Sequence, residues 1–174
     1  MIASNSTNEV LTTLRQIIRA IDLQSKKLVK KYGLTLPQLI LLKEIKENPE
    51  QPISKISKQV SLSQATVTSI LDRLEKQGFA VRERGKEDKR KVYTYITEKA
   101  ETILSIKPQL LQESFSREFE KLEEWEKNMI LSALQRLTFL MNADDIESQP
   151  MLASGPLEAS PAEVNSFLED EYSN

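Results

Sequence analysis

Positively charged side chains are concentrated in one ten-residue stretch of the sequence, residues 82–91. The cations of this stretch are Arg82, Arg84, Lys86, Lys89, Arg90 and Lys91. Lysine and arginine neutralise nucleic-acid phosphates, and a guanidinium group also fits the narrow, electronegative minor groove of A·T-rich DNA. The stretch therefore indicates a nucleic-acid backbone as its target. The alternative is an ordinary mixed-charge turn that contacts only solvent.

A second group of polar side chains lies between residues 64 and 73. Apolar residues at 67, 70, 71 and 74 follow the spacing of one helical stripe, which leaves the remaining side chains facing outward. The outward residues are Gln64, Ala65, Thr66, Thr68, Ser69 and Arg73. In a major groove, Gln64 suits adenine, while the methyl groups of Ala65 and Thr66 suit thymine. This face is predicted to read base edges, and the alternative is that it is simply solvated.

A helix-turn-helix would present this face to DNA. Ser63 is suited to cap the amino end of the helix, and Gly78 is suited to end it. A shorter helix is predicted after Pro52, and its Lys55 and Lys58 are candidates for phosphate contacts. We place Ser63, at the start of the reading helix, in the same candidate interface.

After Gly78 the apolar period changes from helical to alternating. Residues 79–84 and 91–97 read as two strands, rich in β-branched and aromatic side chains, and the charged residues 85–90 form the hairpin tip between them. A helix-turn-helix followed by such a hairpin is a winged helix. Asp88 stands out at the tip, because a phosphate repels a carboxylate.

Helices are expected on both sides of the winged helix. Residues 8–31 form an amphipathic pattern that ends before Gly33, and a second helix begins with a capping box at Thr35. The pattern is helical again from Thr97, and Pro108 should break it near Lys107. Both ends carry more apolar residues than a small winged domain needs, which favours a dimer interface over a purely internal core. These residues include Val10, Leu14, Ile17, Phe115, Phe119, Trp125, Leu134 and Leu137.

The formal net charge of -2 hides a strongly uneven distribution. Residues 142–174 hold eight acidic residues and no lysine or arginine, so the remainder of the chain is basic. The composition of this tail predicts a largely disordered segment. One stretch differs, because Ser160, Pro161 and Glu163 form a capping box with proline in the first helical turn, followed by apolar residues at helical spacing.

Several absences exclude function classes. The sequence has no cysteine and no histidine, which excludes histidine-assisted nucleophiles, zinc sites of the Cys/His type and disulfides. The four glycines are too scattered for a phosphate-binding loop. The longest apolar run, Leu39–Leu42, is far too short to span a bilayer, and the amino terminus lacks the pattern of a signal peptide. We therefore expect a cytoplasmic protein that is not an enzyme, uses no cofactor or metal and has no membrane partner.

Residues 63–84, followed by Asp88-x-Arg90 and by Thr-Glu-Lys-Ala at 97–100, closely resemble the MarR family of bacterial transcription regulators. The order of helices and wing resembles that family from residue 8 to about 142. The resemblance implies a homodimer built from the first helix and the last two, with Arg90 in the minor groove and Asp88 holding the wing. Ala100 departs from the family, which often has glycine there.

Residues 15–39 also look like the MarR subgroup that represses ectoine and other compatible-solute genes. The predicted function is a homodimeric repressor of a pseudo-palindromic double-stranded operator, with a small molecule or ionic strength as effector. Tyr32, Arg15 and Trp125 are candidate effector contacts. Two alternatives remain: a small-molecule-responsive regulator of efflux or catabolism, and a protein-interaction module that its acidic tail inhibits.

The expected fold class is mainly α with a small β-wing, a winged helix-turn-helix domain flanked by dimerisation helices. The helical dimerisation region is assigned to residues 1–34 and 98–143, and the DNA-binding domain to residues 35–97. Residues 144–174 are assigned to the acidic tail, with a candidate short helix at 161–171.

Overall fold

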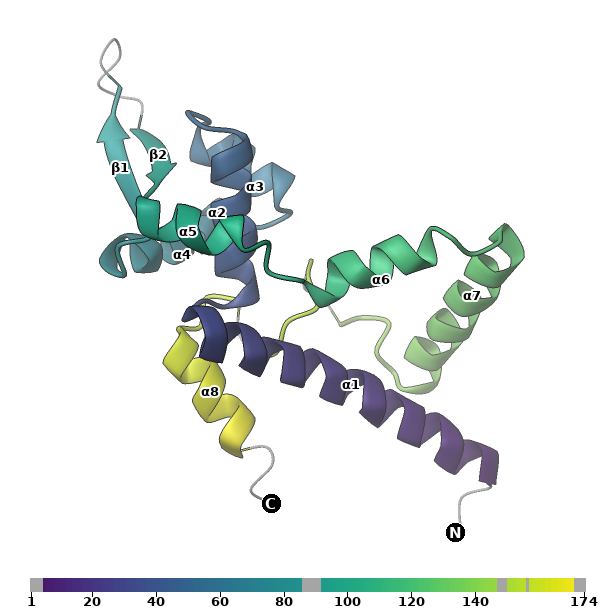
Figure 1. The fold of residues 1–174 in the computed structure, drawn as a ribbon. Coiled ribbons are helices and arrows are strands. Elements are labelled where there is room, and N and C mark those ends of the chain that lie inside the picture. Colours follow the sequence, from purple (N-terminus) through teal and green to yellow (C-terminus); the bar gives the residue numbers. More distant parts are fainter. Residues whose placement is uncertain (1–4, 86–91, 147–149, 156, 171–174) are drawn as a thin grey trace. The chain divides into compact units, whose positions relative to one another are not determined.

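The computed structural model describes residues 5–85, 92–146, 150–155 and 157–170, without the side chains of the last four (Figure 1). The chain divides into two compact units. One comprises residues 1–108 together with 150–174, and the other comprises residues 109–149. Each unit is considered separately below.

Helices α1 (Asn5–Tyr32) and α2 (Leu36–Glu47) open the first unit. Gly33 ends α1 with a φ of 66°, a left-handed conformation that glycine adopts without strain, and its amide donates to the Val29 carbonyl at 2.8 Å. The capping box predicted at the start of α2 is also formed, since the Thr35 amide donates to Gln38 Oε1 at 2.9 Å. Both helix boundaries therefore follow from local sequence signals.

The helix-turn-helix consists of α3 (Ile53–Gln59) and α4 (Gln64–Lys76). The predicted stripe of α4 is confirmed, because Val67, Ile70, Leu71 and Leu74 are all buried. They pack with buried side chains of α2 and α3, which share the core of this unit. Burial of one face fixes which side of α4 remains outward.

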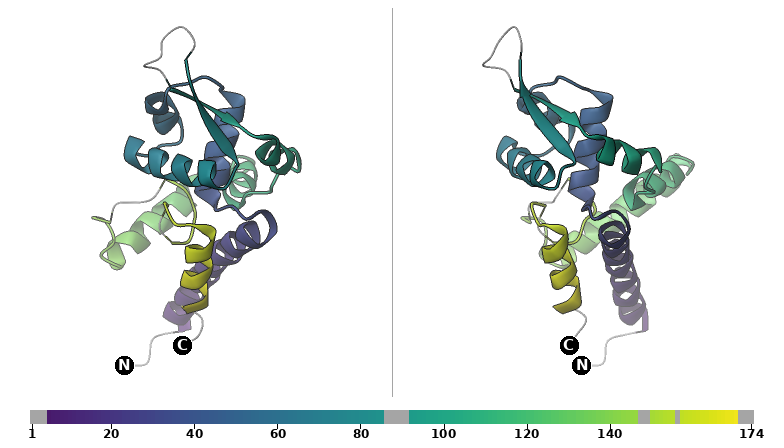
Figure 2. Two further views of the ribbon diagram at one scale, coloured as in Figure 1. Left: turned by 90° about the vertical axis from the view of Figure 1, so that its left-hand side faces the viewer. Right: turned by 60° about the vertical axis from the view of Figure 1, so that its left-hand side comes forward.

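The wing is an antiparallel pair of strands, β1 (Ala80–Arg84) and β2 (Val92–Ile96), followed by α5 (Glu98–Ser105). Strand β1 packs against α4 and β2 against α2, so the base of the ribbon is anchored on the helical core (Figure 2). In the register, Arg82 lies opposite Thr94, which is only 3% exposed. The predicted fold class, mainly helical with a small two-stranded wing, is confirmed.

The second unit contains α6 (Leu111–Phe119) and α7 (Glu124–Leu140). The break predicted near Pro108 is present, since α5 ends at Ser105 and Lys107 has a φ of 52°. Neither helix has a buried side chain, and the rings of Phe115 and Phe119 stack at 5.3 Å between centroids. This unit therefore leaves most of its apolar surface uncovered.

The acidic tail, predicted to be largely disordered with a candidate short helix at 161–171, contains one helix among its described residues. Helix α8 (Pro161–Asp170) lies beside α1 in the first unit (Figures 1 and 2). Val164 is 2% exposed and clusters with Val29 and Ala159. This small apolar cluster holds α8 against α1, and the composition of the tail does not reveal such a contact. Among the described residues, no helix is long and apolar enough to cross a membrane.

Candidate nucleic-acid interface

The amino end of α4 is held by its own side chains. The Thr66 amide donates to Ser63 Oγ at 3.0 Å, so Ser63 caps the helix as predicted. The hydroxyl groups of Ser63 and Thr66 lie 2.9 Å apart, and the Thr68 hydroxyl donates to the Gln64 carbonyl at 2.8 Å. These bonds orient the hydroxyl groups before any ligand arrives, while their second lone pairs stay available as acceptors.

The predicted reading face of α4 is largely open. Gln64, Ala65 and Thr68 are exposed, whereas Thr66 and Ser69 are half-buried. Three exposed side chains at the amino-terminal end of a helix match the geometry in which a recognition helix reaches base edges. The face is accessible, and its base contacts stay predictions.

Lys55 and Lys58 are both exposed on α3. Helix α3 packs against α4 in the same core, so these two cations belong to the same rigid group as the reading face. Positive charge beside a recognition helix suits the phosphate contacts that set its register on DNA.

Arg82 has a different environment from the one the sequence predicts. Its guanidinium group lies 2.5 Å from Asp72 Oδ1 and 3.5 Å from Glu75 Oε2, and it also donates to the Thr68 carbonyl at 3.4 Å. The Arg82 amide donates to Glu75 Oε1 at 3.2 Å. Arg82 therefore ties β1 to α4 through the carboxylates of Asp72 and Glu75. We assign Arg82 a positioning role, and the DNA contact predicted for Arg84 stays a prediction.

Asp72 and Glu75 were not among the predicted site residues. Their i, i+3 spacing places both carboxylates on one side of α4, and this spacing next to an arginine-bearing strand was the available signal. Two carboxylates around one guanidinium would fix the angle between helix and wing.

Arg73 is engaged by the tail. Its guanidinium lies 3.3 Å from Glu163 Oε2 on α8, and its side chain is 34% exposed. The sequence assigned Arg73 to a phosphate, so in this structure a carboxylate occupies the predicted place of the phosphate.

The wing is described only at its base. Arg84 is exposed at the end of β1. Five predicted contacts lie outside the described residues, and their roles stay predictions: Lys86, Asp88, Lys89, Arg90 and Lys91. At the base, the Tyr95 hydroxyl donates to Glu50 at 3.1 Å, and partial desolvation together with this bond raises the pKa of Tyr95.

Two contacts fix the start of β1 to the helix that follows the wing. The Thr97 hydroxyl donates to the Gly78 carbonyl at 2.8 Å, and the Lys99 ammonium lies 4.0 Å from the centre of the Phe79 ring. Within the described part of the chain, no group of three or more acidic side chains could hold a metal ion. The described part of the site is a helix-and-ribbon surface that presents hydroxyl groups, the Gln64 amide and cations.

Residues 34–92 match the model of the MarR family. The winged-helix segment is therefore similar to the MarR family. It is similar to the HTH-type transcriptional regulator MgrA of Staphylococcus aureus, at 35% identity over 79 residues, which are 45% of this chain and 54% of MgrA. The match thus spans about half the length of that curated relative.

Two solved structures show the same architecture over a longer range. The transcriptional regulator SlyA is 28% identical with a TM-score of 0.53, covering 78% of this chain and 95% of SlyA. Streptococcus pneumoniae FabT, solved in complex with DNA, is 21% identical with a TM-score of 0.51, covering 79% of this chain and 96% of FabT. At that identity, FabT supports the fold alone. The similarity in fold therefore extends beyond the matched winged helix.

Proposed function

We propose that this chain is a MarR-type, sequence-specific DNA-binding transcriptional regulator that acts as a homodimer. The observation that carries the proposal is the open polar face of α4, capped by Ser63 and braced to the wing through Arg82. The major groove of DNA is wide enough to admit a helix, so the exposed polar side chains of α4 could reach base edges there.

The proposed binding mode follows from the exposed side chains. The amino-terminal end of α4 would enter the major groove, where Gln64 would pair with an adenine. Lys55, Lys58 and Arg84 would contact phosphates on either side. Arg90 would enter the adjacent minor groove, as the family resemblance implies.

The dimer is proposed from apolar surface that the protomer leaves uncovered. Ile18 of α1 is 55% exposed and Trp125 of α7 is 65% exposed, and each has large apolar neighbours that are also exposed. Exposed apolar surface of this extent marks an interaction site in a soluble protein. A twofold dimer would place two α4 helices on half-sites about 34 Å apart, on a pseudo-palindromic operator.

Repression by occupying a promoter and control of compatible-solute genes are the finer parts of the proposal. Binding that releases counterions weakens steeply with salt: for about 8 phosphate contacts the slope of log K on log salt is about -7. Ionic strength could then act as the signal itself, which suits genes that respond to osmotic stress. A small-molecule effector is compatible with the same operator mode.

A protection footprint on the DNA upstream of the chain's own gene tests this function. We expect a protected pseudo-palindrome at low potassium glutamate that disappears as the salt is raised. Gln64→Ala should weaken the specific footprint more than it weakens binding to random duplex, whereas Lys58→Ala should weaken both alike. A folded protein that protects no site at low salt would refute the proposal.

A further inference from the structure

One ion pair joins the proposed recognition helix to the acidic tail. Arg73 of α4 and Glu163 of α8 approach to 3.3 Å although they lie 90 positions apart in the chain. Arg73 lies at i+7 from Thr66 and i+4 from Ser69, so it shares a stripe with two residues of the predicted reading face. The tail therefore reaches the helix at the end of that face.

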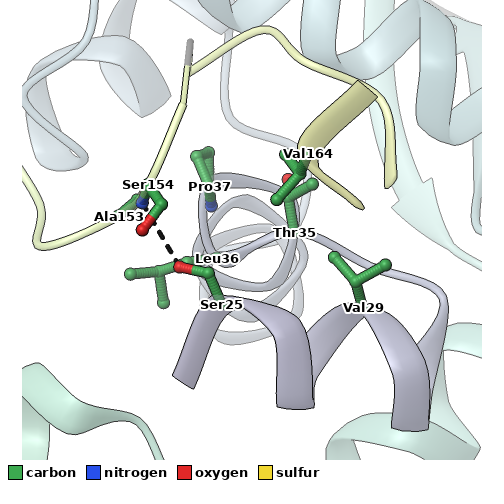
Figure 3. A pocket seen from close by; sticks show the side chains of 8 residues that line it. All are labelled: Ser25, Val29, Thr35, Leu36, Pro37, Ala153, Ser154 and Val164. Carbon is green, nitrogen blue, oxygen red and sulfur yellow. Dashed lines mark hydrogen bonds between the residues drawn. The ribbon is translucent and has the colours of Figure 1, made fainter. Parts of the chain in front are cut away.

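The tail is anchored at other points on the same unit. Ser154 Oγ donates to Asp22 Oδ1 at 2.5 Å, and the Ser154 amide donates to Ser25 Oγ at 3.2 Å. Asp22 is 3% exposed, so this bond lies beneath the tail rather than on open surface. Figure 3 shows the side chains of Ser154 and Val164 facing α1 and the start of α2. These residues line a small cavity of about 10 Å³.

Glu163 is also fixed within its own helix. The Ser160 amide donates to Glu163 Oε2, and the Glu163 amide donates back to Ser160 Oγ at 3.3 Å. Together with buried Val164, this capping box sets the direction of the Glu163 carboxylate. The carboxylate is thus presented to Arg73 by an ordered segment and not by a free chain end.

We propose that the docked tail competes with a DNA phosphate for Arg73, so that α8 is an autoinhibitory element. This inference rests on the proposed DNA-binding function. A carboxylate and a phosphate are both anions that bind a guanidinium through the same N–H groups, so they exclude each other there. Because the tail carries eight acidic residues, a docked tail also repels an approaching backbone.

The contact suits competition better than it suits a structural brace. The side chains of Arg73 and Glu163 are 34% and 62% exposed, and an ion pair this open adds little to stability. A weak, accessible pair can be broken by a phosphate at modest cost. The Arg82 pairs with Asp72 and Glu75 contrast with it, because their guanidinium side chain is only 23% exposed.

The test compares full-length variants on a duplex of random sequence and on the footprinted duplex. Glu163→Gln should tighten binding by about two- to fivefold, since it removes the competing charge while glutamine still completes the capping box. The matched control is Glu158→Gln, which removes the same charge from an exposed position of the same tail. It should tighten binding less, because only general repulsion is relieved.

Arg73→Gln decides whether the effect passes through the ion pair. In that background Glu163→Gln should have no more effect than Glu158→Gln. Equal tightening by the two tail variants, or tightening by Glu163→Gln that survives Arg73→Gln, would overturn the inference. If the protein protects a specific site but Glu163→Gln and Glu158→Gln tighten binding equally, only the autoinhibition is refuted. If Glu163→Gln selectively tightens binding to the random duplex but no site is protected, only the proposed regulator function is refuted.

A second variant releases the tail without touching its charge partner. Val164→Asn places an amide in the apolar contact with Val29 and Ala159, so the tail should undock. Binding should tighten as in Glu163→Gln, and methyl NMR signals of Val29 should shift in the free protein. Undocking without tighter binding would contradict the proposal.

Discussion

At the scale of the residue, the direction of a side chain decides what an arginine does. Arg82 and Arg84 lie two positions apart on the same strand, yet one is enclosed by Asp72 and Glu75 and the other is exposed. Strand periodicity alone puts both on one face of the ribbon. What separates them is contact with α4, which meets Arg82 in the middle of β1 while Arg84 is exposed at the end of the strand.

Arg82→Ala should lower the free energy of unfolding by about 1–3 kcal/mol, because two neighbouring carboxylates lose their shared hydrogen-bonded cation. Arg84→Ala is the matched control and should change stability by less than about 0.5 kcal/mol, as expected of an exposed site. Urea unfolding followed by circular dichroism measures both. The affinity for DNA should show the opposite pattern to stability, because Arg84→Ala should weaken DNA binding while leaving the fold unchanged. Equal stability losses would argue against the positioning role.

The Glu163 carboxyl should make tail docking sensitive to acid. Hydrogen bonds from Ser160, and after them the nearby Arg73 charge, hold its pKa below the ordinary value. The Ser160 bonds belong to α8 itself, so only the part of the lowering that comes from Arg73 favours docking. That part is present while the carboxyl is ionised and disappears as pH falls through the lowered pKa. The Val164 methyl NMR signals should therefore move towards the undocked position on acidification. In Glu163→Gln, a midpoint unchanged from that of the wild type would show that another group titrates.

At the scale of the element, helices whose ends carry local signals were predictable. Gly33 ends α1, Ser63 caps α4 and the residues before Pro108 end α5, and each signal acts within one turn of its own helix. The packing of α8 was not predictable, because Val164 meets Val29 across more than a hundred positions. The capping box at Ser160 indicated a short helix there, but no pattern inside the tail identifies Val29 as the partner of that helix.

Ser63→Ala should lower the stability of the winged helix by about 1 kcal/mol, since the Thr66 amide loses the oxygen that it meets at 3.0 Å. Ser54→Ala is a suitable control, because Ser54 is an exposed serine on the adjacent helix α3. Thermal unfolding of both variants measures the difference. An equal loss of stability in Ser54→Ala would show that the effect of Ser63→Ala does not come from its capping bond.

At the scale of the whole molecule, the charge and the apolar residues are segregated along the chain. The sequence shows both distributions directly, which is why a basic binding region and an interaction surface could be predicted together. The sequence does not show which apolar residues the protomer buries itself. Ile56 and Leu71 are almost fully buried while Ile17 and Leu134 are about half exposed, although all four have similar local patterns.

The exposed apolar residues lead to a prediction about assembly. Leu134→Glu places a charge on a side chain that is 48% exposed in the protomer and would be desolvated in the proposed interface. We expect a monomer by sedimentation and a loss of operator affinity, because one α4 then binds one half-site without its partner. Val92→Glu, at 38% exposure on the wing, should leave the sedimentation of the dimer unchanged. If Leu134→Glu still sediments as a dimer and keeps its operator affinity, this part of α7 lies outside the interface.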